Sequence, residues 1–277
     1  KHGLRERQEM SKRSCGAARS AGGAVLRMAR AEREKEPRIM YTFDSRIRYS
    51  ETDSEGKLTM ASLLNYFQDC STFHSEDVQL GVDYFKERHL VWVLCSWQIV
   101  VERYPRFGES VIIGTQPYDM KGFMGFRNFF MTTEDGKYLA KANSIWSLLN
   151  TDTGKPVSVS EEMALGYGIG EKLEMEYAPR KIAVPEGGIP REVIVVKQHH
   201  LDTNHHVNNG RFVDMAMDFL PSDFAIGQLR AEYKKQAFLD DLLMPRVMVG
   251  EDKAVVSLTD EEGAPYVVVE FLKKEEL

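Results

Sequence analysis

The chain has 277 residues, 43 % of them hydrophobic, and a formal net charge of -6. This length suits one large core or two domains, and the acidic balance argues against a nucleic-acid coat or a polybasic membrane binder. Its apolar runs are shorter than the roughly 18 residues that span a bilayer. The three cysteines, at no ligand-like spacing, indicate neither a disulfide framework nor a CxxC metal site, so we expect a cytoplasmic protein.

The first 39 residues differ in composition from the rest. They hold 11 Lys and Arg against five acids, a net of +6, which leaves 25 basic and 37 acidic groups elsewhere, a net of -12. Because residues 1–39 lack aromatic residues, we predict a disordered N-terminal extension there, with Met40 as the natural start. The alternative, an Arg-rich targeting peptide, fits poorly because such peptides contain few acidic residues, whereas this short segment has five glutamates.

Residues 40–160 are predicted to form an N-terminal domain. Apolar and polar side chains alternate over residues 41–49, which is typical of a half-buried strand. The polar loop ETDSEGK then precedes a helix with apolar residues every three or four positions, with Thr59 as the expected N-cap and Gly81 as the stop. Further strands are predicted at residues 91–101, 110–115, 123–133 and 138–149.

The same order of elements recurs after a linker rich in Gly and Pro, residues 161–189. Residues 190–277 are predicted to form a C-terminal domain that begins with a strand, a polar loop and a helix, at residues 193–196, 197–209 and 210–220. Strands are then expected at residues 229–238, 246–249, 254–258 and 266–272.

The two halves form an internal repeat. Sliding one over the other by 149 positions aligns Asp53 with Asp202 in the loop before each helix. Asn204 and His206 then fall opposite a glutamate and a lysine of the first half. Since only the second copy carries the amide and the imidazole, we expect one half to be catalytic and the other to serve packing and substrate binding.

Several separated motifs together point to a known family. They are RYSETDSEGK leading into SLLNYFQD, VWV, WQIVVERYPRFGE, SIWSLLN, LDTNHHVNN and EYKKQ. The sequence from Tyr41 onward thereby resembles the acyl-ACP thioesterases of plants and bacteria. The resemblance implies an α+β fold of two tandem hotdog domains, each a long antiparallel sheet wrapped around one helix. It also implies an acyl-chain-binding N-terminal domain, a catalytic C-terminal domain and no cofactor.

The catalytic motif of this family resembles D-x-N-x-H, and it matches Asp202, Asn204 and His206. Plant relatives also carry a motif similar to EYRREC, but here its last two positions are Gln236 and Ala237. This departure excludes a cysteine nucleophile at that place. It leaves the role of the family's glutamate to Asp202, to water, or to the amide of Gln236 as a supporting residue.

Thioester hydrolysis needs an activated water molecule and hydrogen-bond donors for the oxyanion. We predict that His206 and Asp202 activate the water while Asn204 orients the water or the carbonyl. Unpaired N–H groups at the start of the following helix, which Asn208 or Asn209 is expected to cap, would receive the oxyanion. Whether Asp202 or His206 takes the proton stays open.

Two other interpretations of the same loop have a physical basis. Asp, Asn and His before a helix commonly serve as turn and cap residues. The four histidines at positions 199, 200, 205 and 206, with Asp202, carry ligand types that zinc accepts. We predict no metal, because adjacent histidines on extended chain point in opposite directions, and we give His199 and His200 no catalytic role.

The resemblance implies an acidic partner, an acyl carrier protein that bears a fatty acyl thioester. A local basic patch is therefore expected at the mouth of the acyl tunnel. Its predicted members are Arg103, Arg106, Lys121, Arg127, Lys234 and Lys235.

The function implied is release of free fatty acid from acyl-ACP, which terminates fatty acid synthesis. The alternatives are a hotdog hydrolase acting on acyl-CoA and a non-catalytic acyl-thioester-binding hotdog protein. The sequence leaves the oligomeric state open, with a homodimer as one option.

Overall fold

The structure is a computed structural model that describes residues 40–184 and 186–274. The predicted N-terminal extension lies outside the described residues. The described chain is an α+β fold in which all named strand pairs are antiparallel. None of its helices is both long enough and apolar enough to cross a membrane.

In the first half, a long antiparallel sheet curves around helix α2 (Met60–Asp77). Thr59 caps this helix as predicted, since its side-chain oxygen accepts the N–H of Ser62 at 3.1 Å. The helix buries one stripe, which includes Leu63, Phe67 and Cys70. In spatial order, the sheet consists of β1 (Tyr41–Arg46), β3 (Ser110–Lys121), β4 (Met124–Thr132), β5 (Tyr138–Asn150) and β2 (Leu90–Val101).

The second half repeats this arrangement around helix α5 (Asn209–Met217). The helix buries Phe212, Val213 and Ala216 against the sheet. In spatial order, the strands are β8 (Ile226–Tyr233), β11 (Pro265–Lys273), β10 (Lys253–Thr259), β9 (Leu242–Val249) and the two-residue β6 (Ile189–Pro190). The two tandem hotdog domains expected from the sequence are thus the fold of the chain.

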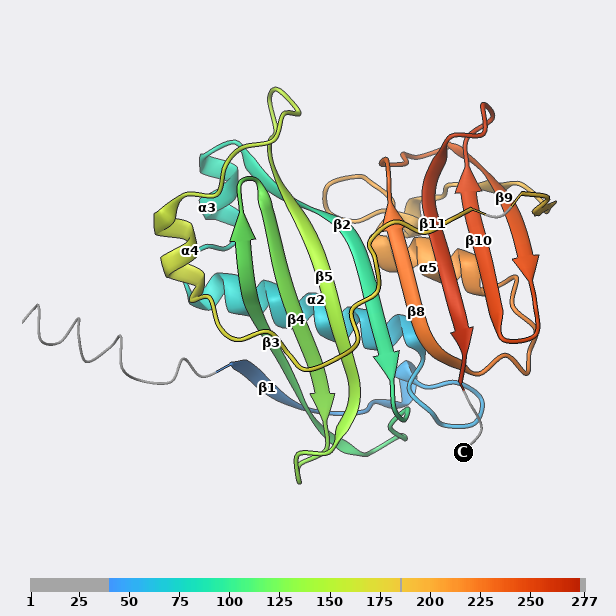
Figure 1. Cartoon of the computed structure of the whole chain (residues 1–277), viewed down its shortest axis with the longest axis horizontal. Helices are drawn as coiled ribbons and strands as arrows, with labels where there is room; N and C mark the ends of the chain where they lie inside the picture. Colours follow the sequence, from blue (N-terminus) through green and yellow to red (C-terminus); the bar gives the residue numbers. More distant parts are fainter. Residues whose placement is uncertain (1–39, 185, 275–277) are drawn as a thin grey trace, which may run out of the picture. The chain divides into compact units, whose positions relative to one another are not determined.

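Strands β2 and β8 join the two halves into one continuous sheet. They pair antiparallel from Ser96 opposite Glu232 to Val100 opposite Gln228. Both long helices lie on the same face of this sheet, and they contact each other (Figure 1). Because the joining strands are antiparallel, the loop before α2 and the loop before α5 lie at opposite ends of the sheet (Figure 1).

Several short elements differ from the prediction. Helix α2 ends four residues before Gly81, because Gln79 takes a left-handed conformation with φ 61°. Helices α3 (Val82–Glu87) and α4 (Glu161–Tyr167) were not expected, and α4 lies in the segment predicted as linker. The strand predicted at residues 193–196 is reduced to β7 (Ile194–Val195), an edge strand that pairs only with β9.

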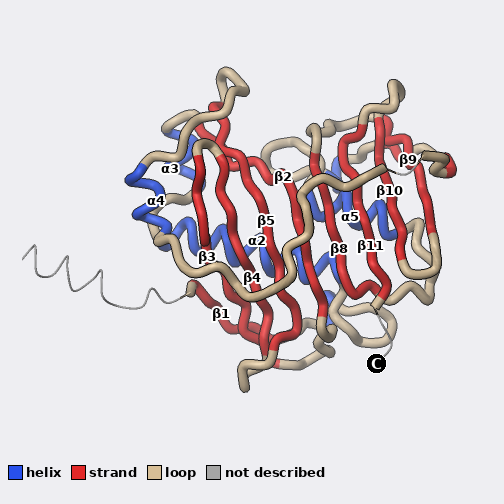
Figure 2. Tube along the Cα trace, viewed as in Figure 1, coloured by secondary structure: helices blue, strands red, loops and turns tan. Residues whose placement is uncertain are grey.

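The segment after α4 crosses the sheet on the face opposite the helices (Figure 2). It is held by a row of polar side chains that stand directly opposite one another on neighbouring strands. This polar row consists of Gln116, Asn128, Asn143, Gln98, Arg230 and Glu270.

The polar row binds the main chain of the crossing segment. The amide of Gln98 donates to the carbonyl of Glu176 at 2.9 Å and accepts the N–H of Ala178 at 2.9 Å. Asn128 accepts the N–H of Leu173 at 3.0 Å. A connection without regular structure thereby satisfies its backbone groups on the sheet, which fixes its path over both halves.

Arg230 and Glu270 form the most buried ion pair in the row, at 2.6 Å, with side chains 13 % and 5 % exposed. We expect Arg230→Leu to lower the free energy of unfolding by about 2–3 kcal/mol, because Glu270 loses a buried partner and, among the described residues, keeps the ion pair with Lys253 alone. Urea denaturation measures this loss. The exposed pair of Lys137 and Asp135 supplies the control, and Lys137→Met should leave the midpoint unchanged. Equal midpoints for both variants and the wild type would contradict the expectation.

Candidate functional site

The loop before each long helix is built around one aspartate. In the first half, Oδ1 of Asp53 accepts the N–H groups of Glu55 and Lys57, both at 2.9 Å. The N–H of Asp53 donates to the carbonyl of Lys57 at 2.8 Å, which closes the loop. Such a carboxylate turn holds a polar loop without help from neighbouring elements.

The loop of the second half has the same three hydrogen bonds. Oδ1 of Asp202 accepts the N–H groups of Asn204 at 2.8 Å and His206 at 3.2 Å. The N–H of Asp202 donates to the carbonyl of His206 at 2.8 Å. The carboxylate of Asp202 therefore has a structural role, the same one that Asp53 has in a loop without amide or imidazole.

One backbone conformation is also shared by the two loops. Gly56 has φ 73°, and His205, its counterpart in the second loop, has φ 61°. Glycine adopts this left-handed region freely, whereas histidine does so at a cost of roughly 1 kcal/mol or more. The second loop holds His205 in this conformation through the same hydrogen bonds, and this turn fixes the positions of Asn204 and His206 on either side.

Helix α5 begins directly after the loop. Asn208 is its N-cap, as expected, and its Oδ1 accepts the N–H of Gly210 at 2.8 Å. A side chain at position 210 would place its Cβ 3.2 Å from that oxygen, so the close approach favours glycine. The half-buried Tyr233 donates from its hydroxyl to the carbonyl of Asn209 at 3.0 Å and so ties the first residue of the helix to β8.

A cavity of about 880 Å³ connects the two halves. In the first half it lies between α2 and the inner face of the sheet. In the second half it is lined by Asp202, Thr203, Asn204 and Asn209. Two of the three predicted catalytic residues thus face a cavity whose larger part belongs to the other half of the chain.

His206, the third predicted catalytic residue, is placed differently. It does not line the cavity, and its ring packs edge-on against Phe238, with the ring centres 5.0 Å apart. Among the described residues, no hydrogen bond joins its imidazole to the carboxylate of Asp202. The backbone N–H and carbonyl of His206 instead link it to Asp202, and the roles of both residues in activating water stay a prediction.

The structure also places Gln236 and the residue after it. Gln236 is exposed, and its side chain makes no hydrogen bond to a described residue. The carbonyl of Ala237 accepts the N–H of Val207 at 2.9 Å, next to His206 in the loop. This position, where plant relatives are expected to have cysteine, therefore supports the loop through its backbone, and a supporting role for the Gln236 amide stays a prediction.

The expected basic patch needs three corrections. Arg127 is wrong as a surface contact, because it is only 7 % exposed and lines the cavity. Arg103 and Arg106 follow the far end of β2, whose first residues line the cavity, and a strand of this length separates its two ends by about 35 Å. They do not surround the cavity mouth. Lys121, Lys234 and Lys235 are exposed, and each forms an ion pair with a nearby carboxylate.

Two features that bear on the site have no clear signal in the sequence. The N–H groups of Thr203 and Asn209 donate to no described residue, and both residues line the cavity. Lys86 of α3 also lines it and forms no ion pair with a described residue. Lys86 lies on the six-residue helix α3, which is too short for a periodic sequence pattern that would predict the helix or its position at the cavity.

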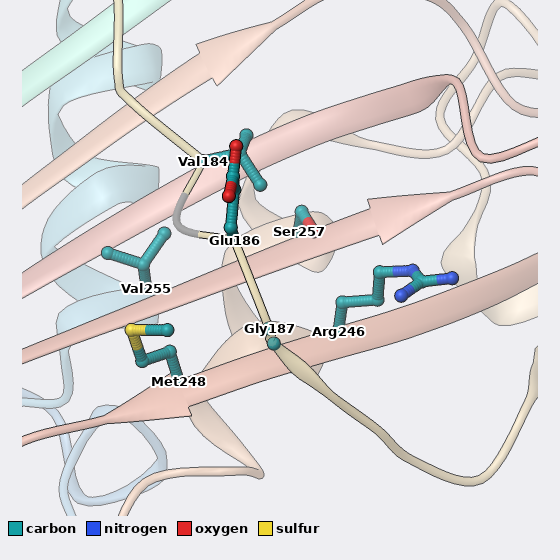
Figure 3. A pocket seen from close by; sticks show the side chains of 8 residues that line it. Val184, Glu186, Gly187, Arg246, Met248, Val255 and Ser257 are labelled. Atoms are coloured by element: carbon teal, nitrogen blue, oxygen red, sulfur yellow. The ribbon is translucent and has the colours of Figure 1, made fainter.

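A second cavity, of about 360 Å³, lies on the opposite face of the second half (Figure 3). Its buried polar group is the hydroxyl of Ser257, which has no hydrogen-bond partner among the described residues. Val255 and Met248 form an apolar wall, and Arg246 extends away from them (Figure 3). None of the predicted site residues lines this cavity, and we assign no site to it.

Metal-ligand clusters were a second interpretation of the histidine-rich loop, and residues 40–184 and 186–274 bear on it. They contain no group of three or more His, Cys, Asp or Glu side chains arranged to hold a metal ion. The rings of His199 and His200 lie 4.2 Å apart, and Nδ1 of His200 accepts the N–H of Lys197 at 2.9 Å. That nitrogen of His200 therefore belongs to a local turn.

Comparison with known families gives two matches in chain order. The family model described as the acyl-ACP thioesterase N-terminal domain matches residues 39–167, and that of the C-terminal domain matches residues 190–247. The chain is similar to a chloroplastic acyl-[acyl-carrier-protein] hydrolase of Cuphea viscosissima, with 25 % identity over 215 residues that cover 71 % of this chain and 51 % of the relative. The chain thus spans about half the length of this relative.

A chloroplastic dodecanoyl-[acyl-carrier-protein] hydrolase of Cinnamomum camphora is 24 % identical, over 78 % of this chain and 61 % of its own length. Two solved structures share the fold. An acyl-ACP thioesterase from Bacteroides thetaiotaomicron has a TM-score of 0.78 at 22 % identity, covering 85 % of this chain and 98 % of its own. The 12:0-ACP thioesterase from Umbellularia californica has a TM-score of 0.76 at 19 % identity, covering 86 % and 98 %.

The two loop aspartates offer a matched test of the structural role. We expect Asp53→Ala and Asp202→Ala each to lower the free energy of unfolding by about 1 kcal/mol, because two backbone N–H groups lose their acceptor. Asp53→Asn and Asp202→Asn should stay close to the wild type, since the amide oxygen still accepts. Urea denaturation of the four variants measures this, and Asn variants as unstable as the Ala variants would contradict it.

Proposed function

Because the chain belongs to the acyl-ACP thioesterase family, we propose that it hydrolyses acyl-ACP and releases the free fatty acid, thereby terminating fatty acid synthesis. The observation that carries this proposal is the cavity shared by the two halves. It runs from an apolar space under the first half of the sheet to Asp202 and Asn204 of the second half. An acyl chain in the first half would place its thioester carbonyl at the loop of the second.

The walls of the cavity suit an aliphatic chain. Gly125 on β4 leaves room for the ring of Trp92, because a Cβ at that position would lie 3.1 Å from the indole. Apolar area removed from water contributes roughly 25 cal/mol per Å², so a buried acyl chain would supply most of the binding free energy. The apolar lining includes Leu80, Phe85, Trp92, Met120, Phe126 and Trp146.

The loop and the helix provide donors for the oxyanion. The free N–H groups of Thr203 and Asn209 both belong to residues that line the cavity. Asn209 is the first residue of α5, where the partial positive charge of the helix dipole favours a developing negative charge. Donors fixed in this way cost no reorganisation when the tetrahedral intermediate forms.

The remaining task is the activation of water. Oδ1 of Asp202 is occupied by two backbone N–H groups, while Oδ2 accepts no hydrogen bond from a described residue. In our proposal, the exposed amide of Asn204 orients the water, and Oδ2 of Asp202 or the imidazole of His206 takes its proton. The water oxygen bonds to the carbonyl carbon, the carbon–sulfur bond breaks, and the thiolate of the carrier leaves.

Substitution separates the acid of Asp202 from its role in the loop. If Oδ2 of Asp202 takes the proton, Asp202→Asn should retain wild-type stability but lose hydrolysis of acyl-ACP by roughly 100-fold or more, since the amide cannot take a proton. Asn204→Ala and His206→Ala should each lose activity with unchanged unfolding midpoints. Release of carrier thiol from purified protein measures the rates. If all three variants hydrolyse at near wild-type rates, the catalytic assignment is wrong.

The carrier protein is a further part of the proposal. An acidic carrier would meet a cation at the mouth of the cavity, and Lys86 is an exposed lining residue without an ion pair to a described residue. The exposed Val82 lies one turn earlier in α3 and offers an apolar contact. We therefore place Lys86 at the carrier contact, while Lys121, Lys234 and Lys235 stay predictions for the same surface.

Charge reversal tests this contact. Lys86→Glu should lower kcat/KM for an acyl-ACP by roughly 10-fold and should affect the matching acyl-CoA less, because only the carrier presents an acidic protein surface. Lys137→Glu is the control, since Lys137 lies in the turn between β4 and β5 and does not line the cavity. The same loss for both thioesters, or for both variants, would remove Lys86 from the contact.

The two alternatives make different predictions in the same assay. An acyl-CoA thioesterase would hydrolyse acyl-CoA without preference for the carrier, and a non-catalytic acyl-thioester-binding protein would release no thiol from either. Our proposal also includes a reducing, cytoplasmic location, which the free Cys70 and Cys95 support. A homodimer stays a prediction.

A further inference from the structure

Arg127 is a charged residue on the inner face of β4, where its neighbours are apolar or glycine. It lies on β4 between Gly125 and Phe129, which face α2, whereas Asn128 faces the crossing segment on the other side. Phe129 is fully buried and packs against Phe67 of α2, with ring centres 5.5 Å apart. Arg127 is only 7 % exposed, so its guanidinium is enclosed between the sheet and the helix.

The partners of this guanidinium are all neutral. Nη1 of Arg127 donates to Nδ1 of His74 at 3.0 Å and to Oγ1 of Thr115 at 3.2 Å. The ring of Tyr167 lies 5.3 Å from Cζ. Within residues 40–184 and 186–274, no carboxylate forms an ion pair with Arg127. The nearby Asp77 accepts the hydroxyl hydrogen of Tyr41 at 2.8 Å instead.

The protonation states follow from burial. Burial lowers the pKa of Arg127 to about 10, so the group stays charged at neutral pH. Burial and the neighbouring guanidinium lower the pKa of His74 to about 4, so the imidazole is neutral and Nδ1 is free to accept. A buried charge without a partner is unfavourable, which implies that an anion supplied from outside would stabilise the cluster.

One edge of the guanidinium is available for such an anion. Nε and Nη2 of Arg127 donate to no described residue, and Arg127 lines the same cavity as Asn204. These two nitrogens form the planar fork that binds a carboxylate through two parallel hydrogen bonds. A phosphate would fit the fork as well, but the space beyond it is the acyl cavity, which favours a carboxylate on an aliphatic chain.

The cluster lies at the end of the cavity away from the catalytic loop. Asn65 of α2 is close to the start of α5, with its Oδ1 3.8 Å from the Cβ position of Gly210. His74 follows nine residues later on the same helix, which corresponds to about 13 Å along its axis. An extended aliphatic chain of moderate length would span this distance.

We propose that Arg127, with His74, Thr115 and Tyr167, forms a carboxylate-binding site at the end of the acyl cavity distant from Asp202. The proposal rests on the proposed function for the other end of the cavity. Two kinds of ligand would bring a carboxylate to this site. One is the terminal carboxylate of a dicarboxylic acyl thioester, and the other is a free fatty acid product bound in the reverse direction.

Thioesters of matched length separate the two sources. Suberoyl-ACP and octanoyl-ACP differ only in the terminal group, carboxylate against methyl, and the ratio of their kcat/KM values reports on that group. For a terminal carboxylate, Arg127→Met should lower the ratio of suberoyl to octanoyl by roughly 10- to 100-fold. Arg127→Lys keeps the charge without the fork and should fall between. Arg48→Met, an exposed arginine outside the cavity, should leave the ratio unchanged.

Calorimetry of the free acids tests the site without catalysis. Wild-type protein should bind suberate, octanoate or both, and Arg127→Met should weaken this binding by at least roughly 10-fold. Octanoate binding that depends on Arg127, with an unchanged ratio of thioesters, would assign the site to the product. The proposal is overturned if wild-type protein binds neither acid and shows no preference for suberoyl-ACP, or if both are unaffected in Arg127→Met.

The two proposals fail in different ways. Absence of octanoyl-ACP hydrolysis by the wild type counts against the thioesterase, while suberate binding still decides on the carboxylate site. Thermal unfolding of each variant checks that it folds. If Arg127→Met does not fold, Arg127→Lys and the wild-type binding of suberate against octane-1,8-diol, which lacks the charge, decide the question.

Discussion

The pairing of β2 with β8 is the interaction on which the rest of the site depends. Five consecutive residue pairs, from Ser96 opposite Glu232 to Val100 opposite Gln228, make one sheet out of two repeats. Because the pairing is antiparallel, the loop of the second half lies beside the first residues of β2, where the cavity of the first half opens. Neither half alone would contain both the cavity beside α2 and the loop with Asn204.

The repeat explains how such a division of roles is compatible with one fold. Asp53 and Asp202 each accept two backbone N–H groups at corresponding positions of their own loops. Thr59 and Asn208 each cap the helix that follows their loop. The loop is therefore stable whatever its exposed side chains are, so Asn204 and His206 can serve chemistry without being needed for folding. The aspartate in both loops, Asp53 and Asp202, is therefore explained by its structural role, independently of any role of Asp202 as an acid.

Much of this could be predicted from the sequence, and the exceptions have physical reasons. Long periodic segments such as α2, the N-caps Thr59 and Asn208, and the repeat itself depend on local patterns. Helices α3 and α4 are too short for a periodic pattern to be visible. The position of His206 beside Phe238 and the ends of β2 depend on tertiary packing, and for this reason the sequence does not show that the His206 imidazole lacks a hydrogen bond to Asp202 or that Arg103 lies far from the cavity mouth.

Arg127 is a residue whose unusual position could be predicted from the sequence, whereas its partners could not. Along β4 the side chains alternate between the helix face and the face that holds the crossing segment, and Arg127 and Asn128 place one polar group on each. Asn128 is satisfied by the backbone of Leu173 and so has a structural explanation. Arg127 interrupts an inward row of Gly125, Phe129 and Met131, and its neutral partners leave its charge uncompensated. Among the described residues no carboxylate neutralises this buried charge, so an anion that arrives with a ligand, as proposed above, would remove the cost of an unneutralised cation in an apolar wall.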